Sequence, residues 1–252
     1  MKRIGGWIGA LSLSVACGSA FAQSSGSWVV TPGVAWIDAG LSSFRNLTST
    51  SAAGTFGSET TGQIHNLFTA EVLVDYFLTD HVSVEAALGI PPKLNMYEQG
   101  MAMPLGSAGP GIDLGKLRPL ASARAWSPTI FVKYNFGSGA SAFRPYLGVG
   151  LNYSRFSSVQ LDPTFAGSVH AFAGPGGTVD ASLSSSWNTA FTAGFSYRLA
   201  NNWYALASAS YIPLRADALV TARSAAGQQT LAVKTRLVGD PTLVFVGIGH
   251  RF

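Results

Sequence analysis

The sequence has little charge, a single cysteine and, after its first residues, no long uninterrupted apolar run. Only 11% of its 252 residues are charged, against about 25% in a typical soluble domain, and 47% are hydrophobic. A high apolar fraction with a net charge of only +4 excludes a disordered chain. Scarce charge together with 29 glycines excludes a coiled coil. No Lys/Arg run follows Lys2-Arg3, so no nucleic-acid partner is expected.

The first 22 residues have the layout of a secretory signal peptide. Lys2 and Arg3 form a positive start, residues 4–15 are apolar and uncharged, and Ala20-Phe21-Ala22 is a small-x-small cleavage site. We therefore expect residues 1–22 to be cleaved and residues 23–252 to form a single domain. The alternatives are an anchoring helix and a lipoprotein attached through Cys17. The cleavage site that follows directly disfavours the first, and Ser14, which stands where a lipobox has an aliphatic residue, disfavours the second.

The residues after Ala22 alternate between apolar and polar side chains. No later stretch reaches ~18 uncharged apolar residues, so no spanning helix is predicted there. Eight segments instead have the period of two that membrane barrel strands require. They cover residues 28–36, 68–76, 82–88, 128–136, 145–153, 187–197, 203–211 and 244–252.

Aromatic residues bracket the apolar faces of these segments. Trp28 and Trp36, for example, lie far enough apart to cover roughly 20–25 Å of the membrane normal at the usual strand rise and tilt. A soluble barrel is the alternative, but its outer face would be polar. The apolar face is the one ringed by Trp and Tyr, which favours a membrane barrel.

The connections between segments alternate in length. Residues 78–81, 137–142 and 200–202 are short turns. The long connections, into which the strands can extend, cover residues 38–66, 91–125, 157–185 and 213–240. The pattern predicts an all-β fold: an eight-stranded antiparallel transmembrane β-barrel in the outer membrane, with short periplasmic turns and long extracellular loops.

Two stretches carry a family resemblance. Phe143-Arg144-Pro145-Tyr146-Leu147-Gly148-Val149-Gly150-Leu151-Asn152-Tyr153, and the closing run Gly247-Ile248-Gly249-His250-Arg251-Phe252, resemble the OmpW family of outer-membrane proteins. The resemblance implies an eight-stranded barrel that helps small hydrophobic molecules across the outer membrane. His250 stands where Tyr is usual in that family. Phe252 keeps the terminal aromatic residue that the barrel assembly machinery recognises in such proteins, so this machinery is an expected partner.

The inward faces of the strands predict a charged plug. An eight-stranded barrel is wide enough only for side chains or one small ligand, which excludes a wide aqueous pore. Glu71 and Glu85 also point inward, without an assigned role. The plug is predicted in the periplasmic half, where unpaired buried charge would be costly, so we expect ion pairs among its residues. Its predicted members are Asp75, Lys133, Arg144, Arg198 and Arg251.

Small and apolar inward residues in the outer half predict a substrate pocket open to the loops. Proline cannot donate to a strand ladder, so Pro91 and Pro128 near the outer rim are predicted to mark a lateral opening. The resulting hypothesis is a passive channel that captures small hydrophobic solutes and releases them sideways into outer-membrane lipid. The alternative is a barrel with a packed lumen whose loops serve adhesion, phage or bacteriocin contact. The predicted pocket residues are Leu67, Thr69, Ala87, Phe131, Leu243 and Phe245.

The sequence carries no pattern for catalysis or metal binding. His65, His81, His170 and His250 are scattered, and no serine stands with a histidine and an acid in a convincing triad. Residues 109–117 have the wrong glycine spacing for a phosphate loop, and Leu117 follows Lys116 where Ser or Thr would bind magnesium. No enzyme activity, catalytic residue, cofactor or metal is therefore predicted, and no oligomeric state.

Overall fold

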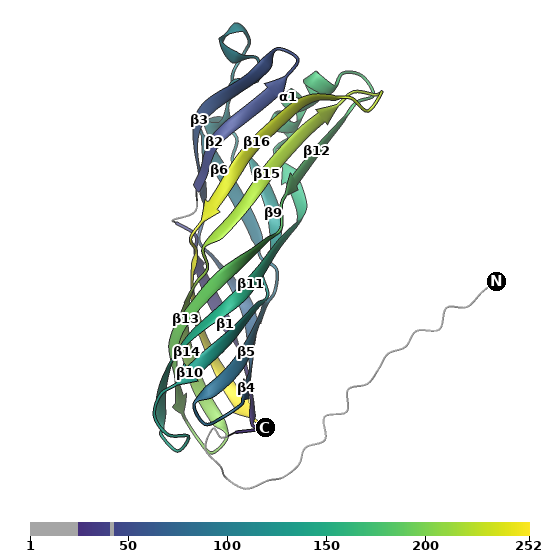
Figure 1. Cartoon of the computed structure of the whole chain (residues 1–252). Coiled ribbons are helices and arrows are strands. Elements are labelled where there is room, and N and C mark those ends of the chain that lie inside the picture. Colours follow the sequence, from purple (N-terminus) through teal and green to yellow (C-terminus); the bar gives the residue numbers. More distant parts are fainter. Residues whose placement is uncertain (1–24, 41–42) are drawn as a thin grey trace, which may run out of the picture.

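The strands stand end to end in two tiers (Figure 1). The computed structural model describes residues 25–40 and 43–252 of the chain. The predicted signal peptide, residues 1–22, lies outside the described residues. No helix in the described part of the chain is long and apolar enough to cross a membrane. We call the lower tier the membrane barrel and the upper tier the outer tier.

The membrane barrel is a closed antiparallel sheet of eight strands. Neighbouring strands follow the order β10-β5-β4-β1-β17-β14-β13-β11, and the pairing of β10 with β11 closes the ring. The eight segments predicted from alternation match these strands to within two residues, except that β11 runs on into the outer tier. The strands are β1 (Trp28–Asp38), β4 (Leu67–Phe77), β5 (Val82–Gly89), β10 (Thr129–Asn135), β11 (Phe143–Leu161), β13 (Ser186–Arg198), β14 (Trp203–Tyr211) and β17 (Thr242–Arg251).

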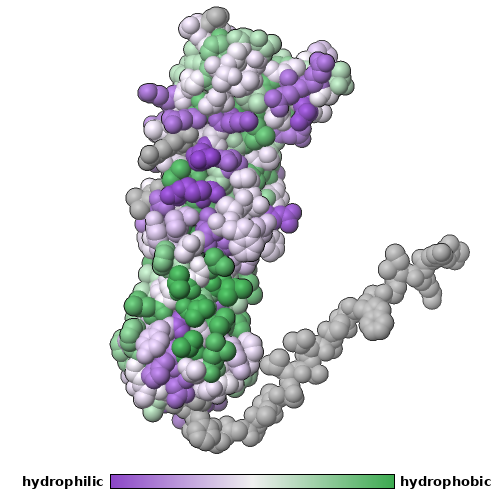
Figure 2. All heavy atoms as spheres, viewed as in Figure 1, coloured by the Kyte–Doolittle hydropathy of each residue, from purple (hydrophilic) through white to green (hydrophobic). Residues whose placement is uncertain are grey.

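The outer face of the membrane barrel is apolar, and hydrophobic residues gather on the lower half of the face in Figure 2. Exposed aromatic residues stand near both ends of this belt, with Trp28, Tyr134 and Trp203 at the periplasmic end and Phe68 and Trp187 at the other. Between them the exposed side chains are aliphatic. Examples are Val34, Val72, Ile130, Val132, Leu147, Val149, Leu151, Val246 and Ile248.

The outer tier replaces most of what the sequence predicted as long loops. Its strands continue the barrel sheet outward, and β12 forms an edge that pairs only with β15 among the described strands. Their polarity is inverted: Leu47, Met96 and Leu237 are buried inside. These strands lack the apolar outward face that marks membrane strands, so the alternation pattern did not predict them. They are β2 (Ser43–Ser51), β3 (Gly54–Ile64), β6 (Lys93–Gln99), β9 (Ala121–Trp126), β12 (Thr178–Leu183), β15 (Leu214–Arg223) and β16 (Gln229–Gly239).

A cap closes the outer end. It consists of helix α1 (Pro163–Ala173) and the segment that holds β7 (Met101–Ala102), η1 (Gly106–Ala108), β8 (Ile112–Asp113) and η2 (Leu114–Lys116). The Asp162 side chain starts α1 by accepting hydrogen bonds from the backbone N–H of Thr164 and Phe165.

The cap packs on a hydrophobic core inside the outer tier. Phe165, Val169 and Ala173 share one face of α1, since they are four residues apart, and all three are buried. The core also contains Leu47, Leu114, Leu117, Leu120, Leu231 and Val233. The interior is therefore not open to the loops as the sequence predicted, because the connecting segments fold inward and fill the mouth.

Candidate functional site

The two tiers meet at a ring of strand interruptions. Four of these junctions, at residues 90–92, 127–128, 212–213 and 240–241, contain proline. Proline has no N–H to donate, so a backbone ladder ends or shifts at such a residue. The ring therefore separates the two tiers and leaves the wall weakest at the level between them.

A cavity of about 110 Å³ lies inside the chain at this level, and we call it the junction pocket. Its lining is mostly aliphatic. A second cavity of about 30 Å³ extends toward the periplasmic end and shares Glu71, Ser127, Ile212 and Leu243 with the first. Together they form a column from the junction into the membrane barrel. Its upper part is mainly aliphatic, and the lining of its lower part also includes Glu85, Thr129, Ser208 and Ser210. The junction pocket is lined by Ile37, Ala39, Ile64, Thr69, Glu71, Gly89, Ile90, Pro92, Leu94, Ala125, Ser127, Ser154, Phe156, Ile212, Leu214, Pro241 and Leu243.

Most of the predicted pocket residues lie along this column. Thr69 and Leu243 line the junction pocket. Ala87, Phe131, Leu243 and Phe245 line the lower cavity. Leu67 lines neither cavity and packs against the hydrophobic core of the outer tier.

Sequence reasoning missed several lining residues at the junctions. Ile90, Pro92 and Ile212 stand outside the predicted strands, where alternation gives no facing direction. Glu71 was placed on the inward face but assigned no role. The only sequence signal for these positions was the proline beside or within each interruption.

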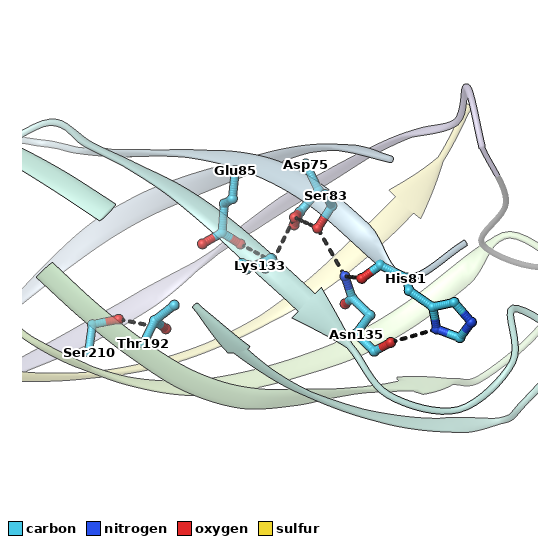
Figure 3. Close-up of polar contacts among 8 residues, drawn as sticks. All are labelled: Asp75, His81, Ser83, Glu85, Lys133, Asn135, Thr192 and Ser210. Carbon is cyan, nitrogen blue, oxygen red and sulfur yellow. Dashed lines mark hydrogen bonds and ion pairs between the residues drawn. The ribbon is translucent and has the colours of Figure 1, made fainter. Parts of the chain in front are cut away.

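A buried ion cluster closes the column below. Lys133 Nζ lies 2.6 Å from Asp75 Oδ1 and 2.6 Å from Glu85 Oε2 (Figure 3), and all three side chains are almost fully buried. Ser83 donates to Asp75, and Asn135 donates to Ser83. We call Asp75, Glu85 and Lys133 the Lys133 cluster. The sequence predicted Asp75 and Lys133 in a plug, and the structure adds Glu85.

The three arginines predicted for the plug lie nearer the periplasmic turns. Arg144 donates to the carbonyl oxygen of Asp80. Arg198 donates to the carbonyl oxygen of Ala140 at 2.6 Å, and Arg251 to Asn202 Oδ1 at 3.0 Å. Each arginine therefore contacts a turn. Within residues 25–40 and 43–252, no group of three or more His, Cys, Asp or Glu is arranged to hold a metal ion.

The wall beside the junction pocket contains a gap in the backbone ladder. The β5–β10 pairing ends at Ala87 opposite Thr129. Pairing resumes where Ala125 N donates to the carbonyl oxygen of Pro92, at 3.1 Å. Among the described residues, no backbone hydrogen bond joins residues 88–91 to residues 126–128. We call this interval the wall gap.

Pro91 and Pro128, the predicted lateral opening, stand on the two sides of the wall gap. Ser127 lines the junction pocket, whereas the next residue, Pro128, lines a groove of about 630 Å³ on the lipid-facing surface. Apolar side chains of Ile130, Val149 and Leu151 also line that groove. At this point, one layer of backbone separates the inner cavity from lipid.

A buried amide fixes one side of the wall gap. The Asn152 side chain on β11 is fully buried, and its Nδ2 donates to Thr129 Oγ1 at 2.9 Å and to Ser127 Oγ at 3.0 Å. Its Oδ1 accepts from Ser154 Oγ at 2.7 Å and from Asn188 at 3.1 Å. The β9–β10 side of the gap is thus tied to β11 and β13.

Comparison with known proteins agrees with this architecture. The model of the OmpW family matches residues 24–252. The chain belongs to the OmpW family. Outer membrane protein W of Vibrio cholerae serotype O1 is 29% identical over 232 residues, which cover 92% of this chain and 91% of the relative. The Escherichia coli K12 protein of the same name is 25% identical and covers 93% and 92%.

Two further comparisons give a more distant relative and a solved structure of the same fold. A relative named dibenzothiophene metabolism operon protein PahQ, from Pseudomonas aeruginosa, is 26% identical and covers 70% of this chain and 68% of its own length. The crystal structure of OprG from Pseudomonas aeruginosa aligns with a TM-score of 0.70 at 22% identity, over 92% of this chain and 98% of that one.

The solid-state NMR structure of AlkL in lipid bilayers aligns with a TM-score of 0.59 at 19% identity, over 96% and 97% of the two chains. These two structures show the shared barrel fold. As an OmpW-family member, the chain is a protein of the cell outer membrane, which confirms the localisation predicted from the sequence.

Proposed function

We propose that this OmpW-family barrel is a passive channel for small hydrophobic molecules, captured in the junction pocket and released sideways into the outer membrane. The observation that carries the proposal is the mainly aliphatic junction pocket that meets an unpaired stretch of wall. The pocket is lined by aliphatic side chains, which favours apolar solutes over ions or sugars. The name of the relative PahQ, which links it to a dibenzothiophene metabolism operon, agrees with an apolar solute.

The Lys133 cluster supports sideways release rather than passage through the barrel axis. Glu85 of this cluster lines the lower cavity, and contacts of 2.6 Å hold it and Asp75 to Lys133. An apolar solute that passed them would have to separate these ions without replacing their interactions, which is costly. The wall gap demands less, because no backbone hydrogen bond has to break between residues 88–91 and 126–128.

Admission from outside requires the cap to move. Phe165 and Val169 of α1 and Leu114 of η2 are buried in the core that fills the mouth of the outer tier. A further cavity of about 60 Å³ lies beneath Phe165, between the cap and the junction pocket. The proposal therefore assigns gating to α1 and the segment of residues 101–120.

The packed cap also favours the second candidate function, a receptor or structural barrel that displays its outer surface. In that case the interior would serve stability alone, and no solute would cross. The two functions differ in whether uptake depends on the junction pocket and on the wall gap.

Accumulation of labelled toluene in Gram-negative cells distinguishes the channel from the receptor. Three strains are compared: one with the wild-type barrel, one without it and one with the Phe131→Arg variant. The arginine would extend into the lower cavity, and Phe131→Leu is the matched control that keeps the lining apolar. We expect uptake to require the barrel, to fall in the arginine variant and to persist in the leucine variant. Equal accumulation in all strains, with each barrel verified in the outer membrane, would favour the receptor function.

A disulfide lock tests the exit. The β5–β10 register, continued past its last pair, sets Gly89 opposite Ser127 across the wall gap. Cysteines at both positions should block release until a reductant is added. The matched control is a cysteine pair at Val82 and Tyr134, which face each other in the paired ladder and line neither inner cavity. Full uptake through the oxidised Gly89–Ser127 lock would refute release through this gap.

A further inference from the structure

The junction pocket contains one charged side chain, Glu71. All other described residues that line it are uncharged. Glu71 lies on β4 between Thr69 and Leu73, on the inward face of the strand, and it lines both the junction pocket and the lower cavity. Glu71 is half-buried and faces a mainly aliphatic lining.

Glu71 has no partner within the described chain, although the other polar groups of the pocket have one. Thr69 Oγ1 donates to the carbonyl oxygen of Ile90 at 2.6 Å. Ser127 and Ser154 share a hydrogen bond of 2.9 Å between their hydroxyl groups. No described side chain or backbone N–H donates to the Glu71 carboxylate, and no ion pair includes it.

The buried ammonium group of Lys133 is already paired with other side chains. Lys133 Nζ contacts Asp75 and Glu85, each at 2.6 Å, and lies 4.2 Å from the centre of the Tyr146 ring. Because Lys133 already contacts two carboxyl groups, it does not supply a cation to Glu71. The pocket thus contains one carboxylate that accepts no hydrogen bond from the described residues, in a mainly aliphatic space.

From this arrangement we propose that the junction pocket selects small apolar solutes that carry a protonated amine, with Glu71 as the residue that binds the ammonium group. This inference rests on the proposed function and specifies its substrate class. An ammonium N–H donor to a carboxylate makes a charge-assisted hydrogen bond, which is roughly twice as strong as a neutral one and gains further where water is excluded. The aliphatic lining would hold the apolar body of the same molecule.

The cavity size suggests a body of one aromatic ring. An engineered apolar cavity of roughly 150 Å³ in another protein accommodates benzene, and the junction pocket of about 110 Å³ continues into the lower cavity. Toluene and benzylamine are therefore suitable probes. They share a ring and one substituent carbon, and benzylamine is protonated at neutral pH.

The test is equilibrium dialysis of each probe against the full barrel in lipid nanodiscs, with empty nanodiscs to subtract partitioning. Glu71→Gln keeps the shape of the side chain and removes its charge, and Glu71→Asp keeps the charge. Glu59→Gln is the control, because it makes the same substitution at an exposed position of β3 that lines none of the cavities. Heat-modified electrophoretic mobility verifies that each variant is folded.

We expect Glu71→Gln to weaken benzylamine binding about tenfold and to leave toluene binding unchanged. Glu71→Asp should retain part of the preference for the amine, and Glu59→Gln should bind as the wild type does. Equal benzylamine affinity in the wild type and in Glu71→Gln would overturn the inference. The toluene arm reports separately on apolar capture: amine binding that depends on Glu71 without toluene binding would support the inference and count against the broader proposal.

Discussion

Replacing Lys133 by methionine should destabilise the barrel strongly, although the substitution only exchanges one buried chain for another of similar length. The substitution leaves Asp75 and Glu85 buried without the ammonium group that lies 2.6 Å from each. At an effective dielectric constant of about 20, the Coulomb attraction over this distance is about 6 kcal/mol for each pair. Protonation of the stranded carboxylates recovers part of this, so we expect the free energy of unfolding to fall by about 3–5 kcal/mol.

The assay is urea-induced unfolding in lipid vesicles, followed through the fluorescence of the five tryptophans in residues 23–252. Lys116→Met is the matched control, because Lys116 pairs with Asp113 at 3.2 Å on the exposed surface of the cap. Surface pairs contribute little, so this variant should unfold as the wild type does. A triple variant, Lys133→Met with Asp75→Asn and Glu85→Gln, should recover most of the loss because it removes the stranded charges together with the cation.

The outcome that refutes this reasoning is a Lys133→Met barrel whose unfolding free energy lies within about 1 kcal/mol of the wild type. It would mean that water reaches the carboxylates and replaces the ammonium group. In that case the Lys133 cluster would not form a dry closure of the column. The argument for sideways release would then lose its electrostatic support.

Two further perturbations test the packing and the electrostatics of the chain. In Gly150→Ala, the new Cβ would lie 2.2 Å from the backbone oxygen of Ile130, so we expect the free energy of unfolding in vesicles to fall by about 1–3 kcal/mol. Gly57→Ala is the control and should be tolerated, because nothing lies within 4 Å of its new Cβ. Burial raises the pKa of Glu98 above its ordinary value of 4.5, against the opposing hydrogen bond from Thr60. The folded state therefore binds this proton more tightly than the unfolded chain, and stability should fall as pH rises from 4.5 through the raised pKa. Glu98→Gln should lack this slope in unfolding midpoints measured across that range, and an equal slope in both proteins would assign it to other groups.

The membrane barrel was predictable from the sequence because lipid imposes a strict rule on every strand. Apolar residues must point outward at alternate positions, and Trp28 with Trp36 marks both limits of one strand. Each strand of the membrane barrel can therefore be predicted from its own residues alone. The same holds for the inward direction of Asp75, Glu85 and Lys133, since each belongs to a strand with a clear outer face.

The outer tier and the junction pocket were less predictable, because the burial of their residues depends on contacts with residues far along the chain. Leu47 and Leu231 are buried only because β2, β16 and the cap meet above the membrane. The serine and threonine residues around Leu47 in β2 are equally typical of a polar loop. Ile90 and Ile212 lie in interruptions, where no alternation sets their direction, so their position in the pocket follows from tertiary structure alone.

The inversion of polarity between the tiers accounts for the position of the pocket and of the proposed exit. In the outer tier the apolar residues face inward, as Leu237 and Met96 do, whereas in the membrane barrel they face lipid, as Val132 and Val149 do. A hydrophobic solute that stays in apolar surroundings must therefore pass from the inside of one tier to the outside of the other. Such a path crosses the wall at the junction, where the two tiers meet, and the wall gap lies there. A disulfide across the wall gap interrupts this path and leaves both tiers intact, which makes it a direct test of whether the inversion serves transport.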